Sequence, residues 1–269
     1  MGDEETGLKQ VRGFLLDVDG VLHIGDRAIS GAPQALAWMQ DHEIPFLLLT
    51  NTTTASRSTL ARRLRQMGLP IAEEQVLTAP VATAAYVARR FPGQRCYLLS
   101  KGDAIDEFLT AGVKVVGPDG EPEADVVVIG GAEDELTYAR LNHAYRLLLV
   151  GAKLVAMHRN TAWRTASGMS LDSGPFITAL ASAAGVRCTM IGKPAAGIFR
   201  QAAEMLGLPA HNLAMVGDDA RNDVVAAQKL GMTGILVRSG KPVGPAQEAQ
   251  ADRVIDSIAD LPRLLKGGN

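Results

Sequence analysis

The feature that most constrains the fold is a regular alternation of short apolar runs with amphipathic stretches along almost the whole chain. The apolar runs lie at Gly13–Leu16, 46–49, 96–99, Val126–Ile129, 154–156, 189–191, 213–216 and 234–237. Segments with helical periodicity separate them, at 33–42, 56–67, Ala79–Arg90, 138–150, 175–184, 197–206 and 223–229. Runs that are apolar at every position are typical of parallel strands buried on both faces. The alternation therefore predicts an α/β fold with parallel sheets covered by helices.

Two acidic residues follow the first apolar run, in the sequence Asp17-Val18-Asp19-Gly20. Residues i and i+2 of a strand point to the same side, so we expect both carboxylates to stand together where the chain turns at Gly20. Close carboxylates repel each other unless a cation or a shared proton relieves them. The pair indicates a divalent-metal site beside a carboxylate nucleophile, although two aspartates can also simply cap a turn.

Three further polar groups follow later apolar runs, and they are Thr50-Asn51-Thr52, Gly192-Lys193-Pro194, and Gly217-Asp218-Asp219 with Asp223. Ligands of open α/β sheets bind at the carboxyl ends of strands, so we expect these groups to contribute to one site. Each group also has an ordinary alternative. Threonines suit helix N-caps, acids are common in the first turn of a helix, and a lysine is most often a surface residue.

The four motifs, in this order, resemble those of the haloacid dehalogenase-like superfamily of aspartyl-phosphate hydrolases over residues 11–265. The spacing resembles subfamily IIA, which has a C2-type cap inserted after the second motif. That branch includes NagD-like and phospholysine phosphohistidine inorganic pyrophosphate phosphatase-like proteins. The resemblance implies a Rossmann-like core with a parallel sheet, here residues 10–79 and 187–265, and an inserted α/β cap domain, here residues 80–186.

The resemblance also implies a chemistry for the first and last motifs. Asp17 is expected to be the nucleophile that forms an aspartyl phosphate, and Asp19 the general acid and then base. A carboxylate oxygen of Asp17, the backbone carbonyl of Asp19 and the carboxylate of Asp218 are expected to bind Mg²⁺, which prefers hard oxygen ligands. Asp219 and Asp223 are expected in the second shell, and the division of roles between them stays open.

The two remaining motifs are expected to bind the substrate phosphate. Lys193 would pair with the nucleophile and offset the charge that develops at phosphorus. Thr50, Asn51 and Thr52 would offer a hydroxyl, an amide and backbone N–H groups to phosphate oxygens.

The resemblance places substrate specificity in the cap, where residues 157–160 and 170–176 are expected to form a loop over the site. Arg159, Trp163 and Arg164 are candidates for substrate contact, and each is equally compatible with an ordinary surface position.

Composition narrows the classes of partner. With 27 basic and 29 acidic residues and no long basic tract, the chain favours neither nucleic acid nor a membrane surface. Its five histidines lack metal-ligand spacing, and no P-loop or Gly-x-Ser-x-Gly signature occurs. The polar first ten residues do not resemble a signal peptide, and Cys96 and Cys188 lie far apart, so we expect a reduced cytoplasmic protein. Because relatives of this branch often pair, we expect a homodimer.

The predicted activity is hydrolysis of a small phosphorylated metabolite by a Mg²⁺-dependent phosphatase. One alternative is a mutase-like phosphoryl-transfer enzyme of the same superfamily. Another is a module that senses Mg²⁺ or phosphate without turnover. Asp19, which can protonate a leaving oxygen, favours a hydrolase over the sensing module.

Overall fold

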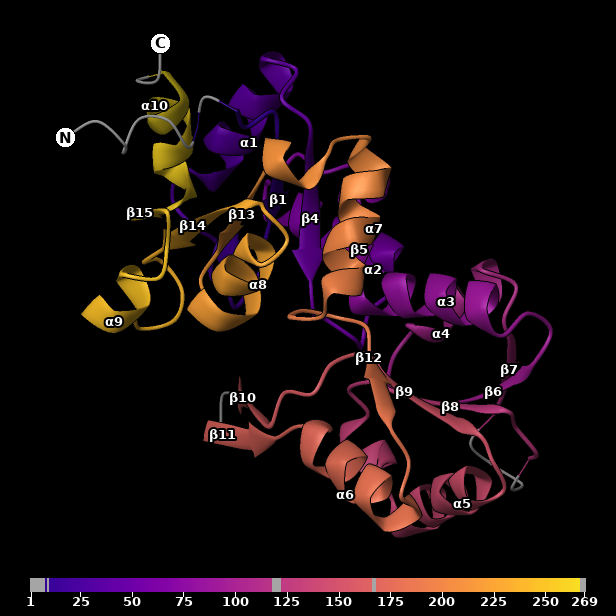
Figure 1. Cartoon of the computed structure of the whole chain (residues 1–269). Coiled ribbons are helices and arrows are strands. Elements are labelled where there is room, and N and C mark those ends of the chain that lie inside the picture. The colour runs from indigo at the N-terminus through magenta and orange to yellow at the C-terminus, as the bar shows by residue number, and fades with distance from the viewer. Residues whose placement is uncertain (1–7, 9, 118–121, 166–167, 267–269) are drawn as a thin grey trace. The chain divides into compact units, whose positions relative to one another are not determined.

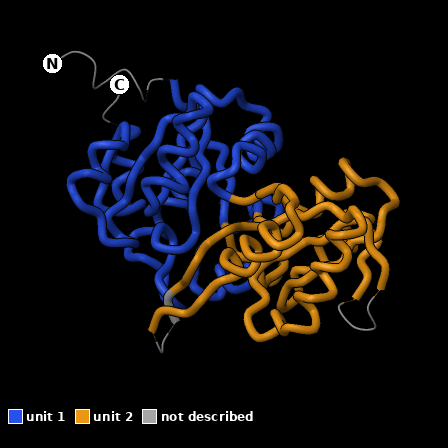
Figure 2. The backbone as a smooth tube through the Cα atoms, turned by 60° about the horizontal axis from the view of Figure 1, so that its bottom comes forward, with its two compact units in different colours: residues 1–50, 60–77, 193–269 blue, residues 51–59, 78–192 orange. Residues whose placement is uncertain are grey.

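The computed structural model describes residues 8, 10–117, 122–165 and 168–266. The chain divides into two compact units (Figure 2), the first formed by residues 1–50, 60–77 and 193–269 and the second by residues 51–59 and 78–192. Each unit is built on its own parallel sheet with helices, which confirms the predicted α/β fold. Among the described residues, no helix is both long and apolar enough to cross a membrane.

The first unit contains a six-stranded sheet with the strand order β15-β14-β13-β1-β4-β5 (Figure 1). The pairs from β15 to β4 are all parallel. Its strands are β1 (Gly13–Leu16), β4 (Phe46–Thr50), β5 (Val76–Thr78), β13 (Leu213–Gly217), β14 (Thr233–Val237) and β15 (Arg253–Ile255). Two very short strands, β2 (His23–Ile24) and β3 (Arg27–Ala28), form a separate antiparallel ribbon.

The order of the strands creates a switch point at the centre of this sheet. From β1 the chain adds β4 and β5 on one side, and later adds β13, β14 and β15 on the other. Connections that leave neighbouring strands in opposite directions open a crevice at the carboxyl ends of those strands. The residues that follow β1 and β13 therefore meet at the place where such sheets bind ligands.

The central strand β1 is buried at all of its positions because both faces of the sheet are covered. Phe14 and Leu16 pack in one core cluster with Leu36 and Leu64 from two of the helices. Leu15 lies between them in the strand, is fully buried, and points to the opposite face. The apolar run thus forms a strand with no polar face, as parallel strands do when helices cover both sides.

Helices of different lengths surround this sheet. Helix α1 contacts α10, and α7 contacts both β4 and α8. Their bounds are α1 (Ala32–Asp41), α7 (Ala196–Leu206), α8 (Val225–Gln228), α9 (Pro245–Glu248) and α10 (Leu261–Lys266), and α2 (Arg57–Gln66) starts in the segment of the second unit and continues in the first. A π-helical turn, Ala220–Val224, precedes α8 directly.

The second unit has a five-stranded sheet of order β12-β9-β8-β6-β7, in which every pair is parallel. Tyr97, Val127 and Leu154 of three neighbouring strands pack with Leu148 and Ile177 of two helices to form its core. The strands are β6 (Arg95–Leu99), β7 (Lys114–Val116), β8 (Val126–Ile129), β9 (Lys153–Ala156) and β12 (Cys188–Met190). The helices are α3 (Ala79–Arg90), α4 (Ile105–Thr110), α5 (Tyr138–Leu149) and α6 (Gly174–Ala184).

An antiparallel hairpin leaves this unit between β9 and α6. It consists of β10 (Ala162–Thr165) and β11 (Gly168–Leu171), with Ala162 opposite Leu171 and Thr165 opposite Gly168. Residues 157–160 and 170–176 were expected to form a loop, and part of that region is this hairpin.

Candidate active site

Neighbouring strands bring two of the predicted acids together although 200 residues separate them in the sequence. Asp17 follows β1 and Asp218 follows β13, and the last ladder pair of these strands is Leu16 with Val216. The N–H of Asp17 donates to the carbonyl of Val216 at 2.9 Å, which continues the ladder by one residue. This hydrogen bond positions Asp17 at the switch point of the sheet, and the pairing of β1 with β13 brings Asp218, the residue after β13, to the same edge.

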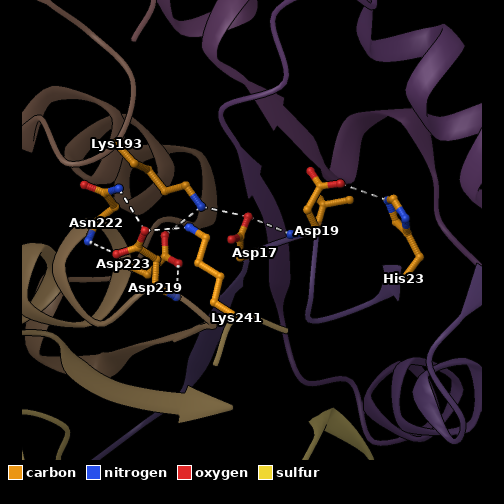
Figure 3. A network of polar contacts seen from close by, with 9 residues as sticks. Asp17, Asp19, His23, Lys193, Asp219, Asn222, Asp223 and Lys241 are labelled. Carbon is orange, nitrogen blue, oxygen red and sulfur yellow. Dashed lines mark hydrogen bonds and ion pairs between the residues drawn. The ribbon is translucent and has the colours of Figure 1, made fainter. Parts of the chain in front are cut away.

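The side chain of Lys193 forms two short ion pairs in the same place (Figure 3). Its Nζ lies 2.7 Å from Oδ1 of Asp17 and 2.7 Å from Oδ1 of Asp223. Only 4% of Lys193 is exposed, so this cation is removed from water and is paired with two buried carboxylates. The sequence placed Lys193 after a strand, and that strand, β12, belongs to the sheet of the second unit. Lys193 thus lies on the connection between β12 and α7 rather than at the end of a strand of the six-stranded sheet.

The carboxylate of Asp218 lies in a narrow space between two glycines. A Cβ atom would lie 2.3 Å from Asp218 Oδ2 if added to Gly20, and 2.2 Å from it if added to Gly240. Gly20 also has a φ of 79°, a conformation that side-chain-bearing residues rarely adopt. The N–H of Lys241 donates to Asp218 Oδ2 at 2.9 Å. Close backbone and a direct hydrogen bond thus fix the direction of the Asp218 side chain.

Burial and like charges change the protonation of these acids. Burial and the nearby carboxylate of Asp17 raise the pKa of Asp218 to about 6. Complete burial raises the pKa of Asp223 to about 8, although Lys193 acts in the opposite direction. Burial disfavours the charge of Lys193, but Asp17 and Asp223 outweigh it and raise the pKa of the ammonium. Lys193 therefore stays protonated, and the carboxylates around it hold more negative charge than it neutralises.

Asp19 lies apart from the buried cluster. Strand β1 ends at Leu16 and its ladder continues only to Asp17, so the strand alternation expected for Asp17 and Asp19 does not extend to Asp19. The side chain of Asp19 is 70% exposed and its Oδ1 lies 3.7 Å from Nε2 of His23. Loss of solvation and the charge of Asp17 raise the pKa of Asp19, and water around the exposed carboxylate weakens that effect.

His23 is held in one orientation beside Asp19. Its Nδ1 lies 2.8 Å from the carbonyl of Gly25, and a carbonyl can only accept, so Nδ1 carries a proton. Nε2 then faces the carboxylate of Asp19, as Figure 3 shows. Sequence reasoning missed this neighbour, because a single histidine four residues after Asp19 has no recognisable pattern.

Asp219 is turned away from the cluster by four hydrogen bonds. Its Oδ1 accepts from the N–H groups of Arg221 and Asn222, and its Oδ2 accepts from the amide of Asn222 and from Lys241 Nζ at 2.6 Å. Despite partial burial, these donors and the charge of Lys241 lower the pKa of Asp219. Lys241 was missed in the sequence, although its position shortly after β14 is a signal that strand-end reasoning could have used.

The described residues contain one group of acids that could hold a metal ion, formed by Asp17, Asp218 and Asp223. One oxygen of each lies within 4.8 Å of the others. Oδ1 of Asp223 contacts Lys193 and Oδ2 accepts from the N–H of Asp219 at 3.2 Å, so both of its oxygens are engaged.

Each of the other two acids has one oxygen left for a cation. Oδ1 of Asp17 is bonded to Lys193 and to the N–H of Val18 at 2.7 Å. Oδ2 of Asp218 is bonded to the N–H of Lys241. Within the described part of the chain, no such bond is found for Oδ2 of Asp17 or Oδ1 of Asp218. Hard oxygen donors with an excess of negative charge fit a divalent cation such as Mg²⁺.

The predicted phosphate-binding residues are divided between the two units. Thr50 is the last residue of β4, next to β1, and is 1% exposed. Asn51 and Thr52 follow it directly and are half-buried residues of the second unit. The geometry of the first unit therefore brings together Asp17, Lys193, Asp218 and Asp223, with Thr50 on the neighbouring strand, and does not include Asn51 or Thr52.

The candidate specificity residues lie in the second unit. Arg159 donates through Nη2 to Thr178 Oγ1 at 2.9 Å, and Trp163 is 42% exposed. The side chain of Arg164 lies outside the described part of the structure.

Comparisons with known proteins identify the family. A model described as haloacid dehalogenase-like hydrolase matches residues 14–114, and a second, described as HAD-hydrolase-like, matches residues 190–261. The human haloacid dehalogenase-like hydrolase domain-containing protein 2 is 36% identical over 87% of this chain and 86% of its own length. The chain therefore belongs to the haloacid dehalogenase-like hydrolase family, as the motifs predicted.

Further comparisons show which members of that family the chain resembles. Human phospholysine phosphohistidine inorganic pyrophosphate phosphatase is 33% identical over 96% of this chain and 95% of its own length. The structure of a 4-nitrophenylphosphatase from Thermotoga maritima has a TM-score of 0.87 and 28% identity, and covers 96% of this chain and 98% of its own. NagD from E. coli K-12 has a TM-score of 0.83 and 25% identity, with 93% and 98% covered. The chain is thus an enzyme that groups with phosphatases of the family.

Proposed function

We propose that this protein is a Mg²⁺-dependent phosphatase that hydrolyses a small phosphorylated metabolite through an aspartyl-phosphate intermediate. The observation that carries the proposal is the position of Lys193, 2.7 Å from both Asp17 and Asp223, beside a carboxylate that can bind a metal. An ammonium held there can neutralise a phosphoryl group that arrives at Asp17.

In the first step, a carboxylate oxygen of Asp17 attacks phosphorus and the bond to the leaving oxygen breaks. Asp19 donates its proton to that oxygen, so the product leaves as an alcohol. The raised pKa of Asp19 favours the protonated form needed here, and Nε2 of His23 faces the same carboxyl.

In the second step, Asp19 acts as a base and takes a proton from water. The water oxygen attacks phosphorus, the bond between phosphorus and Asp17 breaks, and inorganic phosphate is released. Because Asp19 is exposed, it can reach both the leaving oxygen and solvent water without a change in the buried cluster.

Asp17, Asp218 and the backbone carbonyl of Asp19 would hold Mg²⁺, with Asp223 and Asp219 in supporting positions. When bound, Mg²⁺ supplies a positive charge that lowers the repulsion between the anionic nucleophile and the anionic substrate. Asp223 keeps Lys193 directed at Asp17, and Asp219 is tied to Lys241.

Lys193 and Thr50, together with Asn51 and Thr52, would bind the phosphate oxygens. In the same proposal, residues 10–79 and 187–265 form the catalytic core, and residues 80–186 form a cap that sets specificity. We also propose that the protein is a cytoplasmic homodimer.

Phosphate release from a panel of phosphorylated metabolites, with Mg²⁺ and with EDTA, tests this function. The panel contains pyrophosphate, pyridoxal 5′-phosphate, sugar phosphates, nucleotides and 4-nitrophenyl phosphate. We expect turnover that needs Mg²⁺ and disappears in Asp17→Asn. Transfer of the phosphoryl group to a second substrate hydroxyl would instead indicate a mutase-like enzyme. Mg²⁺ binding without any product would indicate a sensing module.

A further inference from the structure

The hairpin of the second unit leaves the fold through a narrow neck. On the two sides of the neck, the N–H of Asp172 donates to the carbonyl of Thr161 at 3.0 Å, and the N–H of Gly174 donates to the carbonyl of Asn160 at 3.0 Å. A Cβ atom on Gly174 would lie 2.4 Å from the Asn160 oxygen. The two segments at the base of β10 and β11 are therefore in direct backbone contact.

A second segment of the same unit, residues 51–54, lies against the carboxyl edge of the five-stranded sheet. Oγ1 of Thr53 accepts the N–H of Gly131 at 2.9 Å, just after β8, and the carbonyl of Thr53 accepts the hydroxyl of Ser100 at 3.0 Å, just after β6. Thr53 is 4% exposed. A Cβ atom on Gly131 would lie 2.5 Å from Thr53 Oγ1, and one on Gly102 would lie 1.9 Å from the carbonyl oxygen of Thr54. The segment thus packs closely against the residues that follow β6 and β8.

His158 joins the hairpin neck to this segment. Its Nδ1 accepts the N–H of Asn160 at 3.2 Å, so the proton of the neutral ring is on Nε2. Nε2 lies 3.4 Å from Thr53 Oγ1 and 3.8 Å from Oδ1 of Asp172. The ring therefore contacts both sides of the neck and the segment at once.

The environment of His158 favours this arrangement. The residue is 2% exposed, and burial lowers its pKa, although Asp172 acts in the opposite direction. A neutral buried ring with both nitrogens hydrogen-bonded is a rigid connection, because loss of either bond would leave a polar atom unsatisfied.

We propose that His158 is a positioning residue that, through Thr53, fixes the backbone carrying Asn51 and Thr52, the residues assigned to the substrate phosphate. The proposal rests on the proposed function, because that function gives Asn51 and Thr52 their role. In this proposal, one buried side chain contacts both the neck of the β10–β11 hairpin and the segment of residues 51–54, so it links the positions of the two.

Two substitutions of His158 separate its two hydrogen bonds. In His158→Gln, the terminal amide takes the place of Nε2 and can still donate to Thr53. In His158→Asn, the shorter amide takes the place of Nδ1 and can serve only Asn160. We expect His158→Asn to raise both KM for 4-nitrophenyl phosphate and Ki for inorganic phosphate by about tenfold, with His158→Gln close to the wild type.

A second pair of variants tests the same contact from the other side and stays informative if His158→Asn does not fold. Thr53→Ser keeps the hydroxyl, whereas Thr53→Val has the same shape and loses it. We expect KM and Ki to rise together in Thr53→Val and not in Thr53→Ser. We also expect the two variants to have equal melting temperatures, so that the difference is not one of stability. Equal constants within both pairs would overturn the positioning role while the wild type still turns over. A wild type without any phosphatase activity would overturn the proposed function, and the positioning role with it.

Discussion

The ammonium nitrogen of Lys193 lies 2.7 Å from Oδ1 of Asp17, and both residues are at least nine-tenths buried. A buried pair of this kind is costly to form, and it leaves Asp17 fixed in direction with its second oxygen available. Asp223 binds the same nitrogen from the other side, so the lysine cannot turn away from the nucleophile. The arrangement explains how one side chain can orient Asp17 and offset the charge of a phosphoryl group.

Replacement of Lys193 by Met should lower both activity and stability. Asp17, Asp218 and Asp223 would then repel each other without a compensating charge, and breaking a buried pair costs about 3–5 kcal/mol. We expect urea unfolding in EDTA to show a loss of this order and Mg²⁺ to restore part of it. We expect kcat to fall by at least ~100-fold. A Lys193→Met enzyme that matched the wild type in kcat would contradict the role of the ammonium.

Replacement of Asp19 by Asn should have an effect that depends on the leaving group. An alkyl phosphate needs a proton on the leaving oxygen, whereas 4-nitrophenolate leaves without one. kcat/KM reports the step that releases the alcohol. For an alkyl phosphate we expect kcat/KM to fall by ~100-fold or more. For 4-nitrophenyl phosphate we expect the loss of kcat/KM to be smaller by a factor of about ten or more. Equal losses for both substrates would show that Asp19 does not act as the acid.

The raised pKa of Asp218 should make the metal-free protein less stable as pH rises. The folded state keeps the proton up to a pKa of about 6, whereas the unfolded chain loses it near 3.8. The folded state therefore binds more protons between these values, and stability falls with rising pH across this window by about 2–3 kcal/mol from this group. We expect Asp218→Asn to remove this part of the pH dependence in urea unfolding with EDTA. The prediction is wrong if the two proteins show parallel pH profiles between pH 4 and 6.

The narrow space around Asp218 predicts an effect of a single methyl group. In Gly240→Ala the new Cβ would lie 2.2 Å from Asp218 Oδ2, so the carboxylate or the loop must move. We expect Mg²⁺ binding, measured by calorimetry, to weaken by about tenfold or more. Gly197→Ala is the matched control, because no heavy atom beyond its chain neighbours and the backbone of its own helix lies within 4 Å of its Cβ position. If the two variants bind Mg²⁺ equally well, the glycine does not position Asp218.

The parts of the fold that were predictable are those with a strong local pattern. Runs such as Gly13–Leu16 and Val126–Ile129 are apolar at every position, and they are central strands in the structure. Strands β5, β7 and β15 were missed, and each has only three residues and lies at a sheet edge. Strand β12 is as short and also lies at an edge, and it was predicted at 189–191. The helix expected at 223–229 begins instead as a π-helical turn, and helical periodicity does not distinguish the two forms.

The candidate site shows a similar limit of local patterns. Asp17, Lys193, Asp218 and Asp223 were found because each belongs to a motif with a fixed order. Periodicity identifies a strand but not the sheet it joins, so the membership of β12 in the second sheet was beyond reach. The contact of His158 with Thr53 joins segments that are distant in the sequence, and no local pattern marks it.

The proposed mechanism requires that Asp17 become phosphorylated during turnover. Its most direct test is mass spectrometry of peptides from enzyme mixed with 4-nitrophenyl phosphate and Mg²⁺ and quenched in acid during turnover. We expect one added phosphoryl group on the peptide that contains Asp17, which is absent with EDTA and absent in Asp17→Asn. Steady turnover without this modification, or with the phosphoryl group on another residue, would contradict it.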